Sequence, residues 1–183
     1  MTADIIMKPS ATAASSRPVQ MAALSIASIA AATLAGAWYF QLVQGLVPCP
    51  LCLEQRYAYY LLVPLGFLIA LAANWGAPRA VLLAGLAILA LAALGNAGLG
   101  AYHAGVEWGF WAGPTECSGP IVDLGKTGLG KAGGLLAQLD SVKVVRCDEV
   151  QWRFLGLSLA GYNVLISLLM AAIAGWGLRK TSR

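Results

Sequence analysis

Four windows without a charged side chain constrain the fold of this chain more than any other feature. No Asp, Glu, Lys or Arg occurs in residues 18–53, 57–78, 80–106 or 154–178. Each window can supply the roughly 20 apolar residues that cross about 30 Å of hydrocarbon as an α-helix. We therefore predict an all-α membrane protein in which four transmembrane helices form one bundle.

The predicted helices lie within these windows and cover residues 21–43, 57–73, 80–102 and 155–178. A large soluble protein can also bury helices that are apolar on all sides, but 183 residues cannot supply a shell to cover four of them. Only 11% of the residues are charged, compared with about a quarter in ordinary soluble domains. The composition therefore favours a membrane protein.

The first predicted helix has one alternative, a cleaved signal peptide. Lys8 and Arg17 precede an apolar run that contains small residues, as in a secretory signal. The run over residues 21–43 is longer than the roughly 7 to 15 apolar residues of a signal peptide. We therefore expect it to remain as a transmembrane helix.

Four crossings place both chain termini on one side of the membrane. We expect residues 1–20 and 179–183 to be cytoplasmic tails of a transmembrane domain at 21–178, with outer connections at 44–56 and 103–154. Basic residues near helix ends favour the cytoplasm, and most basic residues of the outer connections lie far from helix ends. The second outer connection is long enough to carry structure of its own.

All four cysteines lie in the two outer connections. Cys49 and Cys52 belong to the first connection, and Cys117 and Cys147 belong to the second. An even number of cysteines confined to one face indicates an oxidising compartment. This agrees with the charge pattern and places both connections outside the cytoplasm. Four cysteines allow three pairings, and spacing alone does not choose among them.

The pair Cys49-Pro50-Leu51-Cys52 stands near the end of the first window. If Pro50 is the first residue of a helix, a position that favours proline, Cys49 caps that helix and Cys52 lies in its first turn. Backbone N–H groups and the helix dipole would then stabilise a thiolate. Arg56 follows four residues after Cys52 on the same helical face. Its alternative role is an anchor at the membrane interface.

Zinc binding and a purely structural disulfide are the alternatives for the C-x-x-C pair. Zinc normally needs a second close pair of Cys or His, whereas Cys117 and Cys147 lie far apart and the chain has one histidine. We therefore expect no metal. A disulfide between Cys49 and Cys52 would close a loop so small that it hardly constrains the unfolded chain.

The end of the third predicted helix is rich in aromatic residues. Trp108, Phe110 and Trp111 are typical of the aromatic belt at a membrane interface. His103 is predicted to lie at the same depth as Arg56. It is either a polar interfacial residue or, together with Arg56, one of two residues that flank a cofactor headgroup.

Two glycine patterns in the second outer connection resemble nucleotide-binding motifs. Residues 128–133 match G-x-G-x-x-G, but nothing before them reads as a buried strand. Residues 125–127 resemble the end of a P-loop, but Pro120 stands where its first glycine should be. We expect instead a short helix over residues 124–139 that lies in the membrane interface.

Taken together, these features resemble the disulfide bond formation protein B (DsbB) family. The resemblance rests on the C-P-L-C motif with Arg56, on a second cysteine pair in the other outer connection, and on the sequence CDEVQWRFLGLSLAGYN that leads into the fourth helix. It covers residues 21–178. In the related vitamin K epoxide reductase family the quinone-facing C-x-x-C lies in a transmembrane helix, whereas the fourth predicted helix here contains no cysteine.

The resemblance implies an electron relay in the bacterial inner membrane, with the cysteines on the periplasmic side. A soluble thioredoxin-fold oxidase of the DsbA type would attack Cys117 and release Cys147. Electrons would pass to Cys49 and Cys52, then to a membrane quinone, either ubiquinone or menaquinone, and on to the respiratory chain. The relay would support disulfide bond formation in exported proteins.

The resemblance also implies roles around the quinone. Cys52 would be the charge-transfer thiolate, Arg56 would donate to a quinone carbonyl, and His103 is a second candidate for the same ring. Gln55, directly before Arg56, stands where the best-known pattern of the family has an acidic residue. This difference affects the expected redox potential of the cysteine pair.

A function of a different class also fits the sequence. Two disulfides that only staple the outer connections would suit a membrane assembly protein or chaperone without catalysis. Gly156 and Ala160, at helical spacing, would suit helix packing in either case. A variant with a dedicated substrate, similar to vitamin K epoxide reductase, would differ in its soluble partner. Redox cycling separates the catalytic and structural alternatives.

Overall fold

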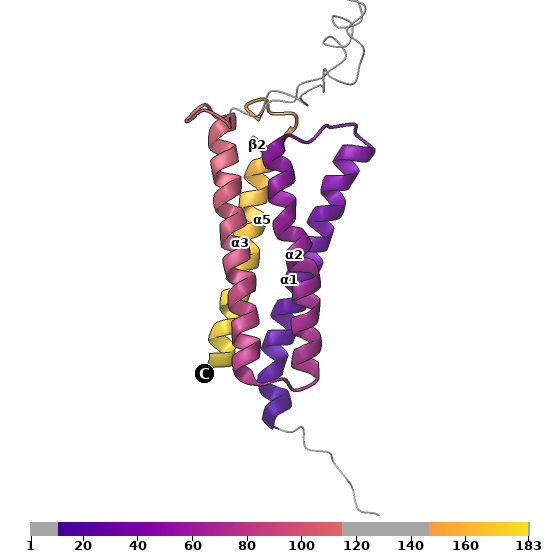
Figure 1. The fold of residues 1–183 in the computed structure, drawn as a ribbon, viewed down its shortest axis with the longest axis vertical. Helices are drawn as coiled ribbons and strands as arrows, with labels where there is room; N and C mark the ends of the chain where they lie inside the picture. Colours follow the sequence, from indigo (N-terminus) through magenta and orange to yellow (C-terminus); the bar gives the residue numbers. More distant parts are fainter. Residues whose placement is uncertain (1–10, 115–146, 183) are drawn as a thin grey trace, which may run out of the picture.

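The structure is a computed structural model that describes residues 11–114 and 147–182. Within these residues four long helices run side by side along one axis (Figure 1). The helices are α1 (Ala11–Leu42), α2 (Pro50–Asn74), α3 (Arg79–Glu107) and α5 (Leu159–Ser182). Each helix is long and apolar enough to cross a membrane. The predicted all-α bundle of four membrane spans is therefore confirmed.

The four helices pack as two close pairs that meet in a shared interior. α1 packs mainly on α2, and α3 packs mainly on α5, while contacts of α1 with α5 and of α2 with α3 close the bundle. Ile26, Leu62 and Leu86 are fully buried where these helices meet. A Cβ atom on Gly66 would lie 2.9 Å from the carbonyl oxygen of Ala23, so glycine permits the close approach of α1 and α2.

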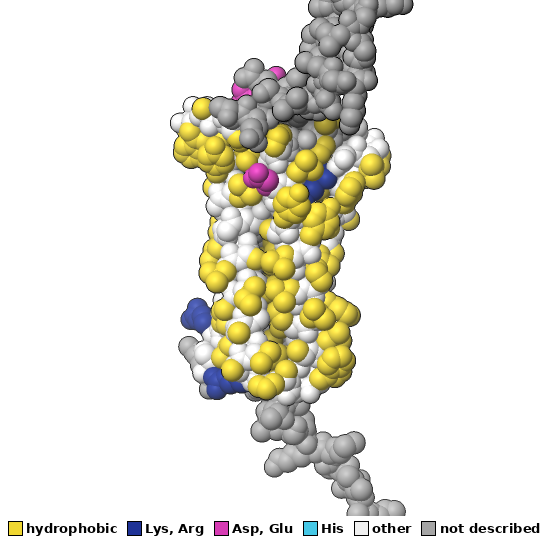
Figure 2. Space-filling view, in the orientation of Figure 1, with side chains coloured by type: hydrophobic (Ala, Val, Ile, Leu, Met, Phe, Trp, Pro, Cys, Tyr) yellow, Lys and Arg dark blue, Asp and Glu magenta, His cyan; other side chains and the backbone are white. Residues whose placement is uncertain are grey.

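The outer surface of the bundle is apolar, as expected for a protein whose solvent is lipid. Leu68 and Leu91 are more than half exposed, as are many other large hydrophobic side chains. Figure 2 shows hydrophobic side chains over the middle of the visible face and charged side chains toward its two ends. Arg179 and Lys180 lie in the last turn of α5.

The helices extend beyond the spans predicted from the charge-free windows. α1 begins at Ala11 instead of residue 21 and contains Pro18. α2 includes residues 50–56 of the predicted first connection, and α3 includes residues 103–107 of the second. A charge marks where a chain leaves hydrocarbon, but a helix can continue into the interface, where water hydrates the charge.

The start of the fourth span was predicted wrongly, because a small hairpin precedes α5. Strand β1 (Arg153–Phe154) pairs antiparallel with β2 (Leu157–Ser158). Leu155 and Gly156 form the two-residue turn with φ angles of 49° and 84°, the positive values that a type I′ turn requires. Gly156 is therefore a turn residue and does not pack between helices, whereas Ala160 is buried within α5.

A serine sets the start of α5. The hydroxyl oxygen of Ser158 accepts a hydrogen bond from the N–H of Gly161 at 3.2 Å, as an N-cap serine does. The Ser158 hydroxyl also donates to the carboxylate of Glu107, which joins the start of α5 to the end of α3. The hairpin and the cap together fix where residues 149–154 lie relative to the helices.

A buried polar network connects three helices below this end of the bundle. Tyr59 of α2 donates to Oδ1 of Asn163 in α5. Nδ2 of Asn96 in α3 lies 3.1 Å from both Asn163 Oδ1 and Ser167 Oγ. Such interhelical hydrogen bonds contribute to association where helices meet inside a membrane.

Several predicted features lie outside the described residues. They are Cys117, the interfacial helix over 124–139 and the two glycine patterns.

Candidate active site at the cysteine end of the bundle

The C-x-x-C motif forms the start of α2 in the predicted way. Pro50 is the first helical residue, and Cys49 is the N-cap with extended backbone angles. The sulfur of Cys49 accepts a hydrogen bond from the N–H of Cys52 at 3.3 Å. The two sulfur atoms lie 2.8 Å apart, within hydrogen-bonding distance of each other. The helix start therefore holds the two side chains together.

Cys49 and Cys52 differ in their surroundings. Cys49 is buried, whereas Cys52 is only partly buried. The hydrogen bond to Cys52 and, next in size, burial raise the pKa of the Cys49 thiol far above its ordinary value. Cys49 therefore keeps its proton to a higher pH than an ordinary thiol. The sulfur of Cys52 is the one that remains available to carry charge.

Cys147 lies at the same end of the molecule, although the sequence places it almost a hundred residues away. It is buried in a cluster with Cys49, Leu51 and Val106. The cluster packs against Cys52 and Leu99. Three of the four cysteines are thus gathered around the start of α2, and the fourth, Cys117, is outside the described residues.

His103 lies next to the cysteine pair, inside the bundle. Its Nε2 atom is 3.6 Å from the sulfur of Cys49, and its Nδ1 atom is 2.8 Å from Nε2 of Gln55. One carboxylate oxygen of Glu107 lies 3.9 Å from His103 Nε2. His103 and Gln55 are both buried. The sequence drew attention to Gln55 only as a departure from a family pattern, and its contact with His103 was not predicted.

Arg56 turns toward α1 rather than toward the cysteines. Its Nη1 atom donates to Oε1 of Gln41 at 2.6 Å, and Nη2 donates to the carbonyl oxygen of Ala37 at 3.3 Å. The guanidinium carbon lies 5.4 Å from the centroid of the Trp38 ring, in a cation–π contact. Arg56 therefore connects α2 to the end of α1 and remains at the edge of the space between them.

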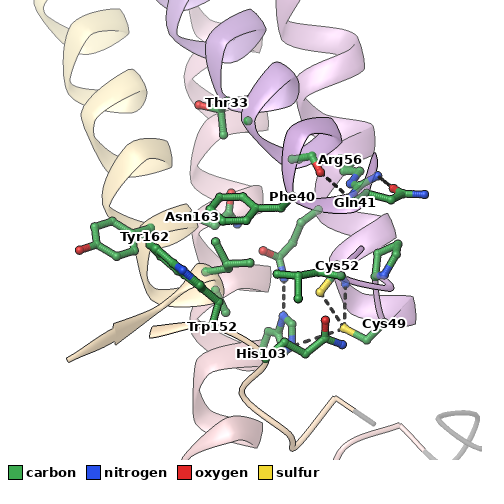
Figure 3. A pocket seen from close by; sticks show the side chains of 18 of the residues that line it. Thr33, Phe40, Gln41, Cys49, Cys52, Arg56, His103, Trp152, Tyr162 and Asn163 are labelled. Carbon is green, nitrogen blue, oxygen red and sulfur yellow. Dashed lines mark hydrogen bonds between the residues drawn. The ribbon is translucent and has the colours of Figure 1, made fainter. Parts of the chain in front are cut away.

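That space is a cavity of about 420 Å³ lined by α1, α2, α3, α5 and residues 149–154. Its volume is within the range of sites for small organic ligands. Figure 3 shows Cys49, Cys52 and His103 at one end and Thr33 at the other. The polar and sulfur-bearing residues of the lining include Gln41, Cys49, Cys52, Gln55, Arg56, His103, Glu107, Glu149 and Gln151.

Aromatic side chains form much of the remaining wall. The rings of Phe40 in α1 and Trp152 have centroids 5.1 Å apart, so the two sides of the cavity meet there. Trp152 also stacks on Phe154 at 5.9 Å and lies 6.2 Å from Tyr162. Figure 3 shows Trp152 and Tyr162 on the side opposite Arg56 and Gln41. The cavity thus combines flat apolar walls with hydrogen-bond donors.

The structure brings together most residues that were singled out from the sequence. Cys49, Cys52, Arg56 and His103 all line the cavity. Gln41 was not singled out from the sequence, although a polar side chain within a long apolar window is a signal of function inside a membrane. Trp152 and Tyr162 belong to the quoted stretch that leads into the fourth helix, but they were given no role of their own.

Comparison with known proteins identifies similar chains. Residues 19–177 match the sequence profile described as "Disulfide bond formation protein DsbB". A disulfide bond formation protein B of Nitrosospira multiformis is 31% identical over 166 residues, which cover 86% of this chain and 90% of the relative. One of Verminephrobacter eiseniae is 34% identical over 168 residues, covering 87% and 86%. No solved structure matches the chain.

Proposed function

Because this chain belongs to the disulfide bond formation protein DsbB family, we propose that it oxidises a soluble dithiol protein and passes two electrons to a membrane quinone. The observation that carries the proposal is the Cys49–Cys52 pair at one end of a cavity that also holds Arg56 and His103. The chain would then be a thiol:quinone oxidoreductase that supports disulfide bond formation in exported proteins.

The proposed location is the bacterial inner membrane, with the cysteine end of the bundle in the periplasm. The four apolar helices support a multi-pass membrane protein. Arg179 and Lys180 in the last turn of α5 favour a cytoplasmic C-terminus. An even number of helices then places the N-terminus on the same side, and the periplasm supplies the oxidising environment that the cysteines need.

The proposed relay begins outside the bundle. A thiolate of the reduced DsbA-type partner attacks Cys117, a new disulfide forms between them, and the bond from Cys117 to Cys147 breaks. The second partner thiol resolves this mixed disulfide, so the partner is oxidised and Cys117 and Cys147 are reduced. The Cys49–Cys52 disulfide then oxidises that pair. The packing of Cys147 beside Cys49 supports this transfer, because the two residues already share one buried cluster.

The cavity fits a quinone by size and by chemistry. A planar ring suits the apolar walls formed by Phe40, Trp152 and Tyr162, and its carbonyl oxygens need the donors that Arg56 and His103 supply. A bound quinone supplies a two-electron, two-proton acceptor at the end of the relay. DsbA-type oxidases have potentials near −120 mV, so the acceptor needs a higher potential, and each 30 mV of difference gives about 1.4 kcal/mol.

The residues around the cysteine pair have distinct proposed tasks. Arg56, held by Gln41 and Ala37, keeps a permanent positive charge at the cavity wall where negative charge develops. Oxidation of the dithiol releases two protons. With the Gln55 side chain flipped so that its amide oxygen accepts from Nδ1–H, His103 Nε2, 3.6 Å from the Cys49 sulfur, can accept one of them, and Glu107, 3.9 Å away, can take it further. Gln55 holds the imidazole in place through Nδ1.

The test uses purified protein in lipid nanodiscs loaded with ubiquinone or, separately, menaquinone. A reduced DsbA-type protein is added and quinone reduction is followed by absorbance. We expect stoichiometric quinone reduction that Cys52→Ser or Cys117→Ser abolishes. Arg56→Ala should raise the quinone concentration needed by about tenfold or more, because a hydrogen bond from a charged group is worth about 1.5–3 kcal/mol.

Arg79→Ala is the matched control, since Arg79 opens α3 at the opposite end of the bundle from the cysteines. It should leave the quinone requirement unchanged. If no quinone is reduced with several partners while the cysteines stay disulfide-bonded, the disulfides are structural. The chain would then be a membrane assembly protein without catalysis.

A further inference from the structure

Three soft donor atoms meet at the cysteine end of the cavity. The sulfur atoms of Cys49 and Cys52 and a ring nitrogen of His103 all lie within 4.8 Å of one another. Figure 3 shows the three side chains converging. No metal was expected from the sequence, because the chain has no second close pair of Cys or His ligands. Here the third donor comes from a helix that is remote in sequence.

The distance from Cys49 to His103 matches that of a tetrahedral zinc site, whereas the two sulfur atoms lie closer together than in such a site. Ligand bonds of about 2.3 Å for sulfur and about 2.0–2.1 Å for nitrogen place sulfur and nitrogen about 3.6 Å apart, and two sulfur atoms about 3.8 Å apart. The observed distance from Cys49 Sγ to His103 Nε2 is 3.6 Å. The two sulfur atoms are 2.8 Å apart, so the side chain of Cys52 would move outward by about 1 Å.

The groups behind the donors also suit a bound cation. The N–H of Cys52 already points at the Cys49 sulfur, where it would stabilise a metal-bound thiolate. Coordination through His103 Nε2 leaves a proton on Nδ1, which then needs an acceptor. Gln55 lies 2.8 Å from Nδ1 and can present its amide oxygen after a flip of the side chain.

We propose that the reduced Cys49–Cys52 pair and His103 form a binding site for a thiophilic divalent cation such as Zn²⁺. Binding displaces one proton from each thiol, so two thiols and one cation give a dithiolate complex and two protons, without change of oxidation state. The fourth position faces the cavity, where Glu107 or a water molecule can occupy it. The Cys49–Cys52 disulfide lacks thiolate ligands and does not bind.

The cation would be an inhibitor rather than a resident cofactor. It holds both electron-carrying sulfur atoms and occupies the end of the cavity that Cys52 and His103 line. This inhibitory consequence rests on the proposed oxidoreductase function, whereas the binding itself does not. Loss of zinc from the reduced state would return the pair to the relay.

The binding test uses the full chain with Cys117→Ser and Cys147→Ser, so that Cys49 and Cys52 are the remaining thiols. The protein is reduced without oxygen in nanodiscs free of quinone and titrated with Co²⁺, then with Zn²⁺. We expect one cobalt per protein, with the intense visible bands of a tetrahedral site and a thiolate charge-transfer band, both removed by Zn²⁺. Oxidation to the disulfide should abolish binding.

Variants identify the third ligand. His103→Ala should weaken Zn²⁺ binding by about tenfold or more, and Gln55→Leu by about tenfold, as for other groups that orient a ligand. Thr33 lines the same cavity at the end opposite the cysteines, so Thr33→Ala removes neither a ligand nor a charge and should leave the affinity unchanged. The proposed site would be overturned if the reduced protein did not bind the cation, or if His103→Ala left the affinity unchanged.

A separate measurement tests inhibition. Quinone reduction by the wild-type protein is measured at increasing Zn²⁺ concentrations, and the rate should fall in proportion to site occupancy. A protein that binds Zn²⁺ at the three residues but reduces quinone at an unchanged rate would overturn the inhibitory role and leave the binding site standing. Failure of quinone reduction without any metal would count against the proposed function and not against the site.

Discussion

The two cysteines of the C-P-L-C motif occupy positions with different chemistry. Cys49 is an N-cap in a buried cluster, and Cys52 is one turn further along and opens on the cavity. The pKa of the Cys49 thiol is raised because its sulfur is hydrogen-bonded to Cys52 and buried. This asymmetry supports the proposal that Cys49 exchanges with the outer cysteines and that Cys52 contacts the electron acceptor.

The raised pKa of Cys49 predicts a pH dependence of alkylation. Iodoacetamide reacts with the thiolate, and a raised pKa means less thiolate at any given pH. In the reduced protein with Cys117→Ser and Cys147→Ser, modification of Cys49 should therefore stay slow at pH 8 and rise only well above the ordinary thiol pKa of about 8.5. Cys52→Ala removes the hydrogen bond that is the largest cause of the raised pKa, so it should accelerate the modification of Cys49 at pH 8. Mass spectrometry of the modified peptide gives the rate, and half-maximal modification below pH 8.5 in the parent would contradict the assignment.

Gln55 offers a second prediction at the scale of a residue. Gln55→Leu leaves Nδ1 of the buried His103 without its partner, so the free energy of unfolding should fall by about 1–3 kcal/mol. Gln44→Leu is the matched control, because Gln44 bonds Tyr39 at an exposed site and its loss should cost less than about 0.5 kcal/mol. Equilibrium unfolding in detergent compares them. Equal effects of the two substitutions would show that the Gln55 contact does not stabilise the fold.

The hairpin before α5 forms part of the cavity wall. Its two strands and type I′ turn hold Trp152 and Phe154 at the cavity wall. Glu107 and Ser158 fix the hairpin to α3, and Gln151 donates to the carbonyl oxygen of Val47 in the first connection at 2.8 Å. A short element thus connects both outer connections to the helices.

Substitution at the turn tests this role. Gly156 has a φ of 84°, so Gly156→Ala should destabilise the hairpin by about 1 kcal/mol and raise the KM for quinone by displacing Trp152. Gly175→Ala in α5 is the control, since a Cβ there meets open space and alanine favours a helix. The two variants are compared in the nanodisc assay. An unchanged KM for Gly156→Ala would mean that the hairpin does not shape the quinone site.

The sequence predicts the helices better than it predicts how they end. Charge-free windows identify the four spans because charge is excluded from hydrocarbon, and Pro50 after Cys49 marks the start of α2. The same rule misplaces the start of α5, because Leu155 and Gly156 are apolar enough to extend the window yet form a turn. The polarity of the side chains indicates how deep a residue lies in the membrane, whereas the hairpin is recognised only from the backbone angles of its turn.

At the scale of the whole molecule, the bundle positions the site by tertiary contacts that no local pattern contains. His103 was predicted at the depth of Arg56 from span lengths, and both line one cavity. The pairing of His103 with Gln55 and the contact of Arg56 with Gln41 depend on how the helices are rotated about their axes. Span lengths carry no information on that rotation.

The buried polar network predicts how strongly the helices are coupled. Asn163→Ala removes the hydrogen-bond partner of Tyr59 and one partner of Asn96. An interhelical hydrogen bond contributes about 0.6 kcal/mol, and a buried donor that is left unpaired costs more. The substitution should therefore lower the free energy of unfolding by about 1–2 kcal/mol. Asn74→Ala, at the last residue of α2, is the control and should change stability little. The two variants are compared by thermal unfolding in nanodiscs. Equal stabilities would show that the polar network does not stabilise the bundle.

The most direct measurement isolates the last half of the relay. The protein with Cys117→Ser and Cys147→Ser is reduced without oxygen, one equivalent of quinone is added, and quinone absorbance is followed while mass spectrometry reports the thiols. We predict that one quinone is reduced for each Cys49–Cys52 disulfide formed and that Cys52→Ser abolishes both changes. A quinone that stays oxidised beside two intact thiols would contradict the central claim that this pair delivers electrons to a quinone.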